Sequence, residues 1–215
     1  MIRLAAERLD SIVVLGAHCD DIAIGAGGTL LTICALRPGI RVDALVLSGG
    51  GTEREAEERS ALAAFCPGAD LELTVLKLPD GRLPAHWDEA KNALEELRAR
   101  TDPGVVLAPR TVDAHQDHRG LAMLVPTVWR GYLTLGYEIV KWDGDLGRLP
   151  AYVPLTTKLA ERKVQLLQEH YASQRHRPWY DREAFLGLAR IRGIECQEQY
   201  AEAFELNKLV LDLRG

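Results

Sequence analysis

The chain has 215 residues, of which 47% are hydrophobic and 27% are charged. At roughly 100–200 residues per domain, residues 1–215 fit a single domain whose core is large enough to fold without disulfides. The 31 acidic and 26 basic residues give a formal net charge of −5. This charge argues against a nucleic-acid partner, because phosphate binding shows as a basic excess. Ordinary hydrophobic content and a small net charge per residue also exclude intrinsic disorder.

The cysteines and the apolar segments indicate a compartment. The four cysteines are widely spaced and form no C-x-x-C pair, so the sequence predicts neither a disulfide framework nor a cysteine-rich zinc module. The N-terminal segment lacks the long apolar stretch of a signal peptide. The apolar stretches are also far shorter than the ~20 residues that span a bilayer. We therefore expect a cytoplasmic protein without a membrane span.

The first 110 residues alternate short apolar runs with helical stretches. The expected strands cover 11–16, 41–47, 71–76 and 104–108, and the expected helices cover 26–36, 53–65 and 87–100. This alternation is typical of a Rossmann-like α/β domain, with a mostly parallel sheet and helices on both faces. The later chain is less regular. There we expect helices near 119–131, 157–170 and 181–193, and strands near 137–141 and 208–212.

A polar cluster directly follows the first expected strand. It contains His18, Asp20 and Asp21, at the carboxyl end of a strand, where open α/β sheets bind ligands. One interpretation is a turn in which Asp20 or Asp21 caps the following helix. Three such residues together favour a ligand site instead, with His18 and Asp21 directed inward as a pair of metal ligands.

The glycines after this cluster resemble part of a dinucleotide-binding motif. Gly25 and Gly27 begin a G-x-G-x-x-G pattern, but Leu30 occupies its last position. The preceding aspartates would repel a pyrophosphate, and the motif needs glycine in the tight turn before the helix. We therefore expect these glycines to permit close packing of the first helix, or close approach of a substrate.

A second polar cluster follows the strand expected at 104–108. It contains His115, Asp117 and His118, with Asp113 beside them. A solvated loop is one interpretation, but this loop also leaves the carboxyl end of a predicted parallel strand. In a doubly wound sheet, the first strand and a strand after the third flank the topological switch point. We therefore expect the two clusters to face one crevice.

Together the clusters offer two histidines and one carboxylate as a metal site with open positions. That set suits catalytic zinc and also non-heme iron(II), and the ligand types do not separate the two. The remaining residues would complete a hydrolytic site, with Asp20 as a general base, His115 as an acid or oxyanion stabiliser, and Asp117 orienting an imidazole.

These residues resemble the signatures of the PIG-L superfamily, also called LmbE-like, of metal-dependent N-deacetylases that act on N-acetylglucosamine-type substrates. The first signature, A-H-P-D-D-E before a glycine-rich stretch, corresponds to residues 17–22, and the second, H-x-D-H, to residues 115–118. The weaker similarities, which extend over most of the chain, are Arg54-x-x-Glu57, Leu78-Pro79-Asp80-Gly81, His170-x-x-x-Gln174 and Ala201-Glu202-Ala203-Phe204. The resemblance implies an LmbE-like fold.

The resemblance also implies a role for each matched residue. The metal ligands would be His18, Asp21 and His118. Asp20 would be the general base, His115 would stabilise the oxyanion or protonate the leaving amine, and Asp117 would support that imidazole. Arg54 and His170 would contact the substrate, whereas the rest of the charged run 53–59 would be a solvated helix face.

Two positions depart from the family pattern. Cys19 replaces the usual proline, and Ile22 replaces a common glutamate. Neither is an implied ligand, so the chemistry should be retained. Cys19 would place a thiol near the metal, which leaves inhibition by oxidation or an altered metal preference open.

The resemblance implies hydrolysis of an N-acetyl amide on a small amino sugar or its conjugate. The cofactor would be zinc, or another divalent metal such as iron(II). An amidase that cleaves a larger sugar or thiol conjugate would use the same site. A non-heme iron oxygenase and a non-catalytic sugar- or nucleotide-binding domain stay open as further alternatives, as does a homo-oligomer.

Overall fold

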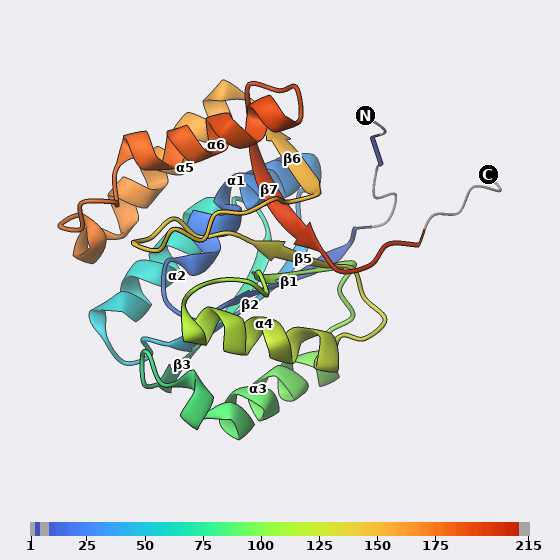
Figure 1. Ribbon diagram of the computed structural model, residues 1–215. Helices are drawn as coiled ribbons and strands as arrows, with labels where there is room; N and C mark the ends of the chain where they lie inside the picture. The colour runs from blue at the N-terminus through green and yellow to red at the C-terminus, as the bar shows by residue number, and fades with distance from the viewer. Residues whose placement is uncertain (1–2, 5–8, 211–215) are drawn as a thin grey trace.

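Figure 1 shows the computed structural model of the protein, which describes residues 3–4 and 9–210. The described residues form a seven-stranded sheet with the strand order β3-β2-β1-β4-β5-β7-β6. Helices cover both faces of this sheet (Figure 1). The predicted α/β fold with a mostly parallel sheet is confirmed.

The sheet has a parallel part and an antiparallel edge. The parallel strands are β1 (Ser11–Gly16), β2 (Arg41–Ser48), β3 (Asp70–Leu78), β4 (Val105–Pro109) and β5 (Thr134–Tyr137). The antiparallel strands are β7 (Tyr200–Leu206), which pairs with β5, and β6 (Ala151–Leu155), which pairs with β7.

Six α-helices are present in the described part of the chain. They are α1 (Asp21–Leu36), α2 (Glu53–Phe65), α3 (Trp87–Ala99), α4 (Gln116–Val128), α5 (Thr157–His170) and α6 (Arg182–Glu195). Two short 3-10 helices, η1 (Leu83–Ala85) and η2 (Ala172–Gln174), lie between them. None of the helices in the described residues is long and apolar enough to cross a membrane.

The central strands contribute side chains to two separate cores. In β1, Ile12 and Val14 pack with α1, α2, α5 and α6 on one face of the sheet. Val13 and Leu15 pack with α3 and α4 on the other face. All four side chains are fully buried. Burial on both faces explains why residues 12–15 of this strand are all apolar.

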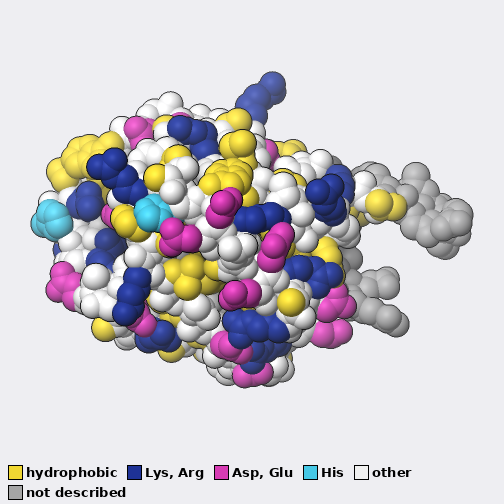
Figure 2. Space-filling view, turned by 90° about the horizontal axis from the view of Figure 1, so that it is seen from below, with side chains coloured by type: hydrophobic (Ala, Val, Ile, Leu, Met, Phe, Trp, Pro, Cys, Tyr) yellow, Lys and Arg dark blue, Asp and Glu magenta, His cyan; other side chains and the backbone are white. Residues whose placement is uncertain are grey.

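Helix α3 is amphipathic and covers the second core from outside. It buries Ala90, Leu94 and Leu97, which recur at the spacing of one helical face. Figure 2 shows the molecule from below, the side on which α3 and α4 lie in Figure 1, with acidic and basic side chains interspersed over this face.

Helix α1 is buried along most of its length because its glycines let neighbouring side chains approach. A Cβ on Gly25 would lie 2.1 Å from the Tyr137 ring, and one on Gly27 would lie 2.6 Å from the Phe65 ring. The expectation of close packing is therefore confirmed. The helix begins at Asp21, five residues before the predicted start. Tertiary packing here outweighs the low helix propensity of glycine.

The second half of the chain contains the main errors of the sequence prediction. Only Tyr137 of the strand expected at 137–141 lies in β5. Residues 208–210 form no strand, and residues 211–212 lie outside the described residues. Strands β6 and β7 were not predicted. Strand β6 contains a proline, which an edge strand tolerates. In β7 the apolar pattern is interrupted by Glu202, whose buried carboxylate pairs with Lys163 at 2.6 Å.

The close approach at Gly25 makes a stability prediction. We expect Gly25→Ala to lower the free energy of unfolding by about 1–3 kcal/mol, because the added methyl would overlap the Tyr137 ring. The measurement is urea unfolding followed by circular dichroism. Gly187→Ala in α6 is the matched control, because a Cβ at Gly187 meets no atom within 4 Å. It should stabilise the protein by up to about 1 kcal/mol. Equal effects at the two sites would contradict the packing argument.

Candidate active site

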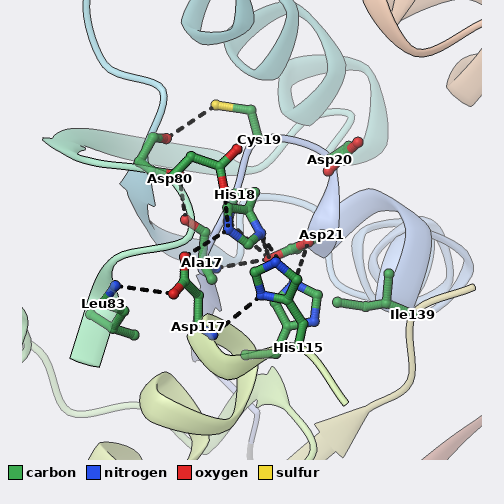
Figure 3. A network of polar contacts seen from close by, with 12 residues as sticks. Ala17, His18, Cys19, Asp20, Asp21, Asp80, Leu83, His115, Asp117 and Ile139 are labelled. Atoms are coloured by element: carbon green, nitrogen blue, oxygen red, sulfur yellow. Dashed lines mark hydrogen bonds and ion pairs between the residues drawn. The ribbon is translucent and has the colours of Figure 1, made fainter. Parts of the chain in front are cut away.

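The two polar clusters meet where β1 and β4 lie side by side. His18 follows β1, and His118 lies in the first turn of α4, after β4. His18 Nδ1 lies 3.1 Å from His118 Nε2. Asp21 completes the group, with Oδ2 3.6 Å from His18 Nδ1 and Oδ1 3.3 Å from His118 Nε2. Figure 3 shows the His18 and Asp21 side chains pointing toward one another.

The turn after β1 is shaped by Asp20 and Asp21 in different ways. The Asp21 Oδ2 atom accepts hydrogen bonds from the backbone N–H groups of Ala17 and His18, both at 2.9 Å. Asp20 occupies the N-cap position of α1, but its side chain makes no capping hydrogen bond. The capping interpretation is therefore wrong. The Asp21 carboxylate holds the turn, and both aspartates line the hollow beside it.

Each of the two central histidines is backed by carboxylates on its second nitrogen. His18 Nε2 lies 3.1 Å from Asp117 Oδ2 and 3.1 Å from Asp80 Oδ1. His118 Nδ1 lies 3.0 Å from the buried Asp113 Oδ1. A carboxylate in this place fixes the ring orientation and makes the free nitrogen a better metal ligand.

The Asp117 carboxylate faces His18 and not His115, the imidazole that it was expected to support. This carboxylate contacts His18 and accepts hydrogen bonds from the N–H groups of Gly81 at 2.7 Å and Leu83 at 3.0 Å. His115 is oriented by the Asp117 backbone instead, whose N–H donates to His115 Nδ1 at 3.2 Å. In a neutral ring the His115 proton therefore lies on Nε2.

The electrostatics of the cluster favour a cation. Burial opposes protonation of His118, but Asp21 and Asp113 outweigh it and raise the pKa of His118 to about 9. Burial also opposes protonation of His18, while Asp21 and Asp117 raise the pKa of His18 well above its usual value. Both imidazoles thus lie in a negative field that would stabilise a bound metal ion.

The pKa values of the other titratable groups in the cluster are shifted in opposite directions. Burial raises the pKa of Asp20 to about 7, against the opposing charge of Arg54. Burial acts the same way on Asp21, but the charges of His118 and His18 outweigh it and hold the pKa of Asp21 well below its usual value. Burial, with His118 and His18, lowers the pKa of His115. Neutral His115 and ionised Asp21 therefore coexist near neutral pH.

The donor set fits a small divalent cation. Bond lengths of 2.0–2.1 Å and tetrahedral angles put zinc ligands about 3.3 Å apart, close to the 3.1–3.6 Å found among His18, His118 and Asp21. Two further groups have possible ligand atoms within 4.8 Å of one another, namely His18–His115–His118 and His18–Asp80–Asp117. The cluster thus offers three overlapping donor sets centred on His18.

Two adjoining hollows open beside the cluster and share His18, Arg54 and Asp80 in their walls. One, of about 240 Å³, is named the tryptophan lobe, and its further lining includes Asp20, His115, His118, Trp142, Arg177 and Trp179. The other, of about 330 Å³, is named the glycine lobe, and its further lining includes Cys19, Gly49, Gly50, Thr52 and Lys77.

The remaining predicted residues fall in different places. Arg54 lines both lobes, and its Nη2 lies 3.0 Å from Asp20 Oδ2. His170 lines neither lobe, and its Nδ1 contacts Ser60 Oγ at 2.9 Å. The structure therefore does not bring His170 to the cleft.

The Cys19 thiol points away from the histidines, contrary to expectation (Figure 3). Its Sγ donates to the Ser48 carbonyl oxygen at 3.5 Å. Burial, with the nearby Glu58 carboxyl, raises the pKa of the Cys19 thiol. A buried, protonated thiol is a poor metal ligand and a slow target for oxidation.

Sequence reasoning missed three residues that the structure places in or beside the cluster. Asp113 had a signal, because it lies two positions before His115 in the same loop. Asp80 lies in the Leu78–Gly81 similarity, to which no role was attached. Glu58 had no signal, because it lies in a charged run expected to be solvated, yet its side chain is fully buried.

A comparison with known families agrees with this geometry. The model of the PIG-L family, described as GlcNAc-PI de-N-acetylase, matches residues 13–129. That range covers more than half of the chain and contains both polar clusters. The chain belongs to the PIG-L family. The resemblance inferred from the sequence motifs is confirmed.

Relatives of this PIG-L protein include deacetylases and one hydratase. YaiS of Escherichia coli (strain K12), named as an uncharacterized deacetylase, is 25% identical over 163 residues, which are 64% of this chain and 85% of YaiS. The N,N′-diacetylchitobiose deacetylase of Pyrococcus horikoshii is 20% identical, with a TM-score of 0.72 over 93% of this chain and 84% of that chain. GalB, the 4-carboxy-2-hydroxymuconate hydratase of Pseudomonas putida KT2440, is 16% identical, with a TM-score of 0.75 over 95% of this chain and 100% of that chain. The fold is shared with the two solved structures, and the reaction has to be argued from the site.

The buried Glu58 carboxyl makes a prediction about stability and pH. Burial raises its pKa to about 8 in the folded protein, against 4.5 in a free chain. Between these values the folded state holds a proton that the unfolded state has released. Stability therefore falls as pH rises, by at most about 1.4 kcal/mol per pH unit.

Glu58→Gln removes this titration and keeps the shape of the side chain. We expect the free energy of unfolding of the variant, relative to that of the wild type, to rise from pH 5 to pH 8 and then level off. Urea unfolding of both chelator-treated proteins at several pH values measures it. A difference that stays constant with pH would show that Glu58 is already ionised in the folded protein.

Proposed function

We propose that this protein is a metal-dependent hydrolase that removes the acetyl group from a small N-acetylglucosamine-type sugar or its conjugate. The observation that carries the proposal is the convergence of His18, His118 and Asp21 around one point, with Asp20 and His115 in the wall of the same lobe. Membership in a deacetylase family supports the reaction class.

The metal would be held by His18 Nδ1, His118 Nε2 and an Asp21 oxygen. A bound zinc ion would act as a Lewis acid toward water and the amide carbonyl. Iron(II) accepts the same donors. Asp117 and Asp113 keep the two rings aimed at this point, so the site is organised before the substrate arrives.

Asp20 is the general base of the proposed reaction. It accepts a proton from the attacking water, whose oxygen adds to the acetyl carbon. Its pKa of about 7 suits this step, because a base works best when its pKa lies near the operating pH. The protonated Asp20 then returns the proton to the amide nitrogen as the C–N bond breaks. Acetate and a free amine are the products.

His115 is the electrophilic group of the proposed reaction. Its lowered pKa keeps the ring neutral, and its Nδ1 accepts the Asp117 N–H. The Nε2–H group is therefore free to donate a hydrogen bond to the developing oxyanion. Preorganised donors of this kind commonly supply a large share of the stabilisation of a tetrahedral intermediate.

The tryptophan lobe supports a sugar as the substrate. Trp142 is 68% exposed at the cleft, and Trp179 lines the same hollow. Indole rings offer broad apolar faces, which complement the C–H face of a hexose ring. Arg177 adds hydrogen-bond donors for hydroxyl groups in the same wall. The Pyrococcus relative is named for a substrate of this chemistry, N,N′-diacetylchitobiose.

The role of Asp20 is tested by Asp20→Asn. Asparagine has the same shape and tolerates the same backbone, but it accepts no proton at neutral pH. We expect kcat for acetate release from N-acetylglucosamine or N,N′-diacetylchitobiose to fall by roughly 10²–10⁴-fold. Metal content should be unchanged. Wild-type turnover by the variant would remove Asp20 from the mechanism.

The same assay separates the proposal from its alternatives. Acetate release by the wild type should stop with a chelator and continue without oxygen. A requirement for oxygen would indicate an iron oxygenase. Full metal content with no acetate from any N-acetyl sugar would favour an amidase on a larger conjugate. Sugar binding without bound metal or turnover would indicate a non-catalytic domain.

The ligand set is tested by metal content. Asp21→Ala and His118→Ala each remove one proposed ligand, so we expect purified protein to bind much less than one equivalent of zinc. His115→Ala should retain close to one equivalent. Inductively coupled plasma mass spectrometry measures both. Loss of zinc from the His115 variant, with retention in the Asp21 variant, would show that the three histidines form the site instead.

A further inference from the structure

The backbone of Asp20 adopts a conformation that its surroundings must enforce. Its φ of 109° lies in the region that favours glycine, and Gln197 is the only other non-glycine residue with a positive φ in the described chain. L-residues rarely adopt this region without support. The position of the Asp20 carboxylate depends on this angle, because the side chain leaves from the same Cα.

Helix α2 contacts Asp20 at two points, from residues one helical turn apart. Arg54 binds the side chain, with Nη2 3.0 Å from Asp20 Oδ2. Glu58 binds the backbone, with Oε2 accepting the Asp20 N–H at 2.9 Å. The same oxygen accepts the Tyr171 hydroxyl at 2.7 Å. Tyr171 follows α5. Helix α2, the end of α5 and the turn after β1 therefore meet at the Glu58 Oε2 atom.

Building this contact into the core is costly, which argues that it has a purpose. Glu58 and Tyr171 are both fully buried, and a buried carboxyl is unfavourable unless its partners compensate. Glu58 Oε1 has no hydrogen-bond partner among the described residues. Anchoring of the nearby loop is already provided by Glu57, whose carboxylate accepts the Ser173 N–H at 2.8 Å and the Ser173 hydroxyl at 2.6 Å.

We infer that Glu58, backed by Tyr171, is a positioning residue that holds the Asp20 backbone in its left-handed conformation and so aims the Asp20 carboxylate into the cleft. The inference rests on the proposed function for its kinetic consequences. It does not assign Glu58 any contact with substrate or metal. The contact of Glu58 with the Asp20 backbone and with Tyr171 is named the clamp. A misplacement of about 1 Å at a reacting group can cost 10²-fold in rate, so loss of the clamp should lower kcat.

The first test compares two substitutions of Glu58. Glu58→Leu fills a similar volume but accepts no hydrogen bond, and we expect kcat for acetate release from N,N′-diacetylchitobiose to fall by about 10–100-fold. KM and metal content should change little. Glu58→Gln keeps an oxygen acceptor for both bonds and should recover most of the lost rate. Tyr171→Phe removes one of the two hydrogen bonds to Glu58, so its kcat should lie between those of Glu58→Leu and Glu58→Gln.

Leu62→Ala is the matched control for lost stability. Leu62 lies one turn after Glu58 on α2, is fully buried, and packs in the core. It should lower the melting temperature and leave kcat per folded molecule unchanged. An equal loss of kcat in Glu58→Leu, Glu58→Gln and Leu62→Ala would show that Glu58 has only a structural role and would overturn the inference.

A double-mutant cycle tests whether Glu58 acts through Asp20. In the Asp20→Asn background the base is already absent, so Glu58→Leu should cause no further loss of the residual rate. A residue that acts on folding, on the metal or on the substrate would lower the rate in both backgrounds. Additive losses in the cycle would therefore contradict a positioning role.

A readout without substrate separates failure of this inference from failure of the proposed function. The amide proton of Asp20, measured by ¹H–¹⁵N NMR, should show a hydrogen-bonded chemical shift in the wild type and the glutamine variant. It should lose that shift in the leucine variant. An unchanged Asp20 signal in the leucine variant overturns the clamp. A changed signal in a protein that deacetylates no sugar leaves the clamp standing and removes the deacetylase proposal.

Discussion

Parallel pairing of β1 with β4 places the two polar loops at one edge of the sheet. Ile12 lies opposite Val105 and Val14 opposite Leu107, so the carboxyl ends of the two strands lie side by side. The chain leaves them in opposite directions, because α1 packs on one face of the sheet and α4 on the other. The loops therefore diverge and leave a crevice at the topological switch point. Contacts between histidines 100 positions apart follow from this pairing.

The same crevice gives adjacent aspartates different chemistry. Asp20 and Asp21 are neighbours in sequence and both are buried. Burial raises the pKa of Asp20 to about 7, whereas His118 and His18 overcome the same burial and hold the pKa of Asp21 well below its usual value. One carboxyl can therefore exchange a proton near neutral pH while its neighbour stays ionised. Environments that drive the pKa values of two carboxyl groups apart are the usual way in which neighbouring acids come to serve different roles.

The sequence predicted what depends on local pattern and missed what depends on tertiary partners. The buried central strands and both polar clusters have short, regular sequence patterns, and the sequence analysis found them. Helix α1 begins earlier than expected because Tyr137 and Phe65 fill the space that its glycines leave. Glu58 was assigned to a solvated face because only the fold brings Asp20 and Tyr171 to it. Asp117 was matched with the wrong imidazole, since sequence distance does not show which ring a carboxylate faces.

The tryptophan lobe is built by parts of the chain that differ from those that hold the cluster. His18, Asp21 and His118 all lie within residues 13–129, the segment that matches the family model. Trp142, Arg177 and Trp179, which shape the tryptophan lobe, lie outside it. A fold that deacetylases share with a hydratase can keep the strand ends constant and vary the later loops. In the proposed reaction, the metal ligands and the base are therefore placed by the pairing of β1 with β4, while the loops after β5 and α5 line the lobe through which a substrate would reach them.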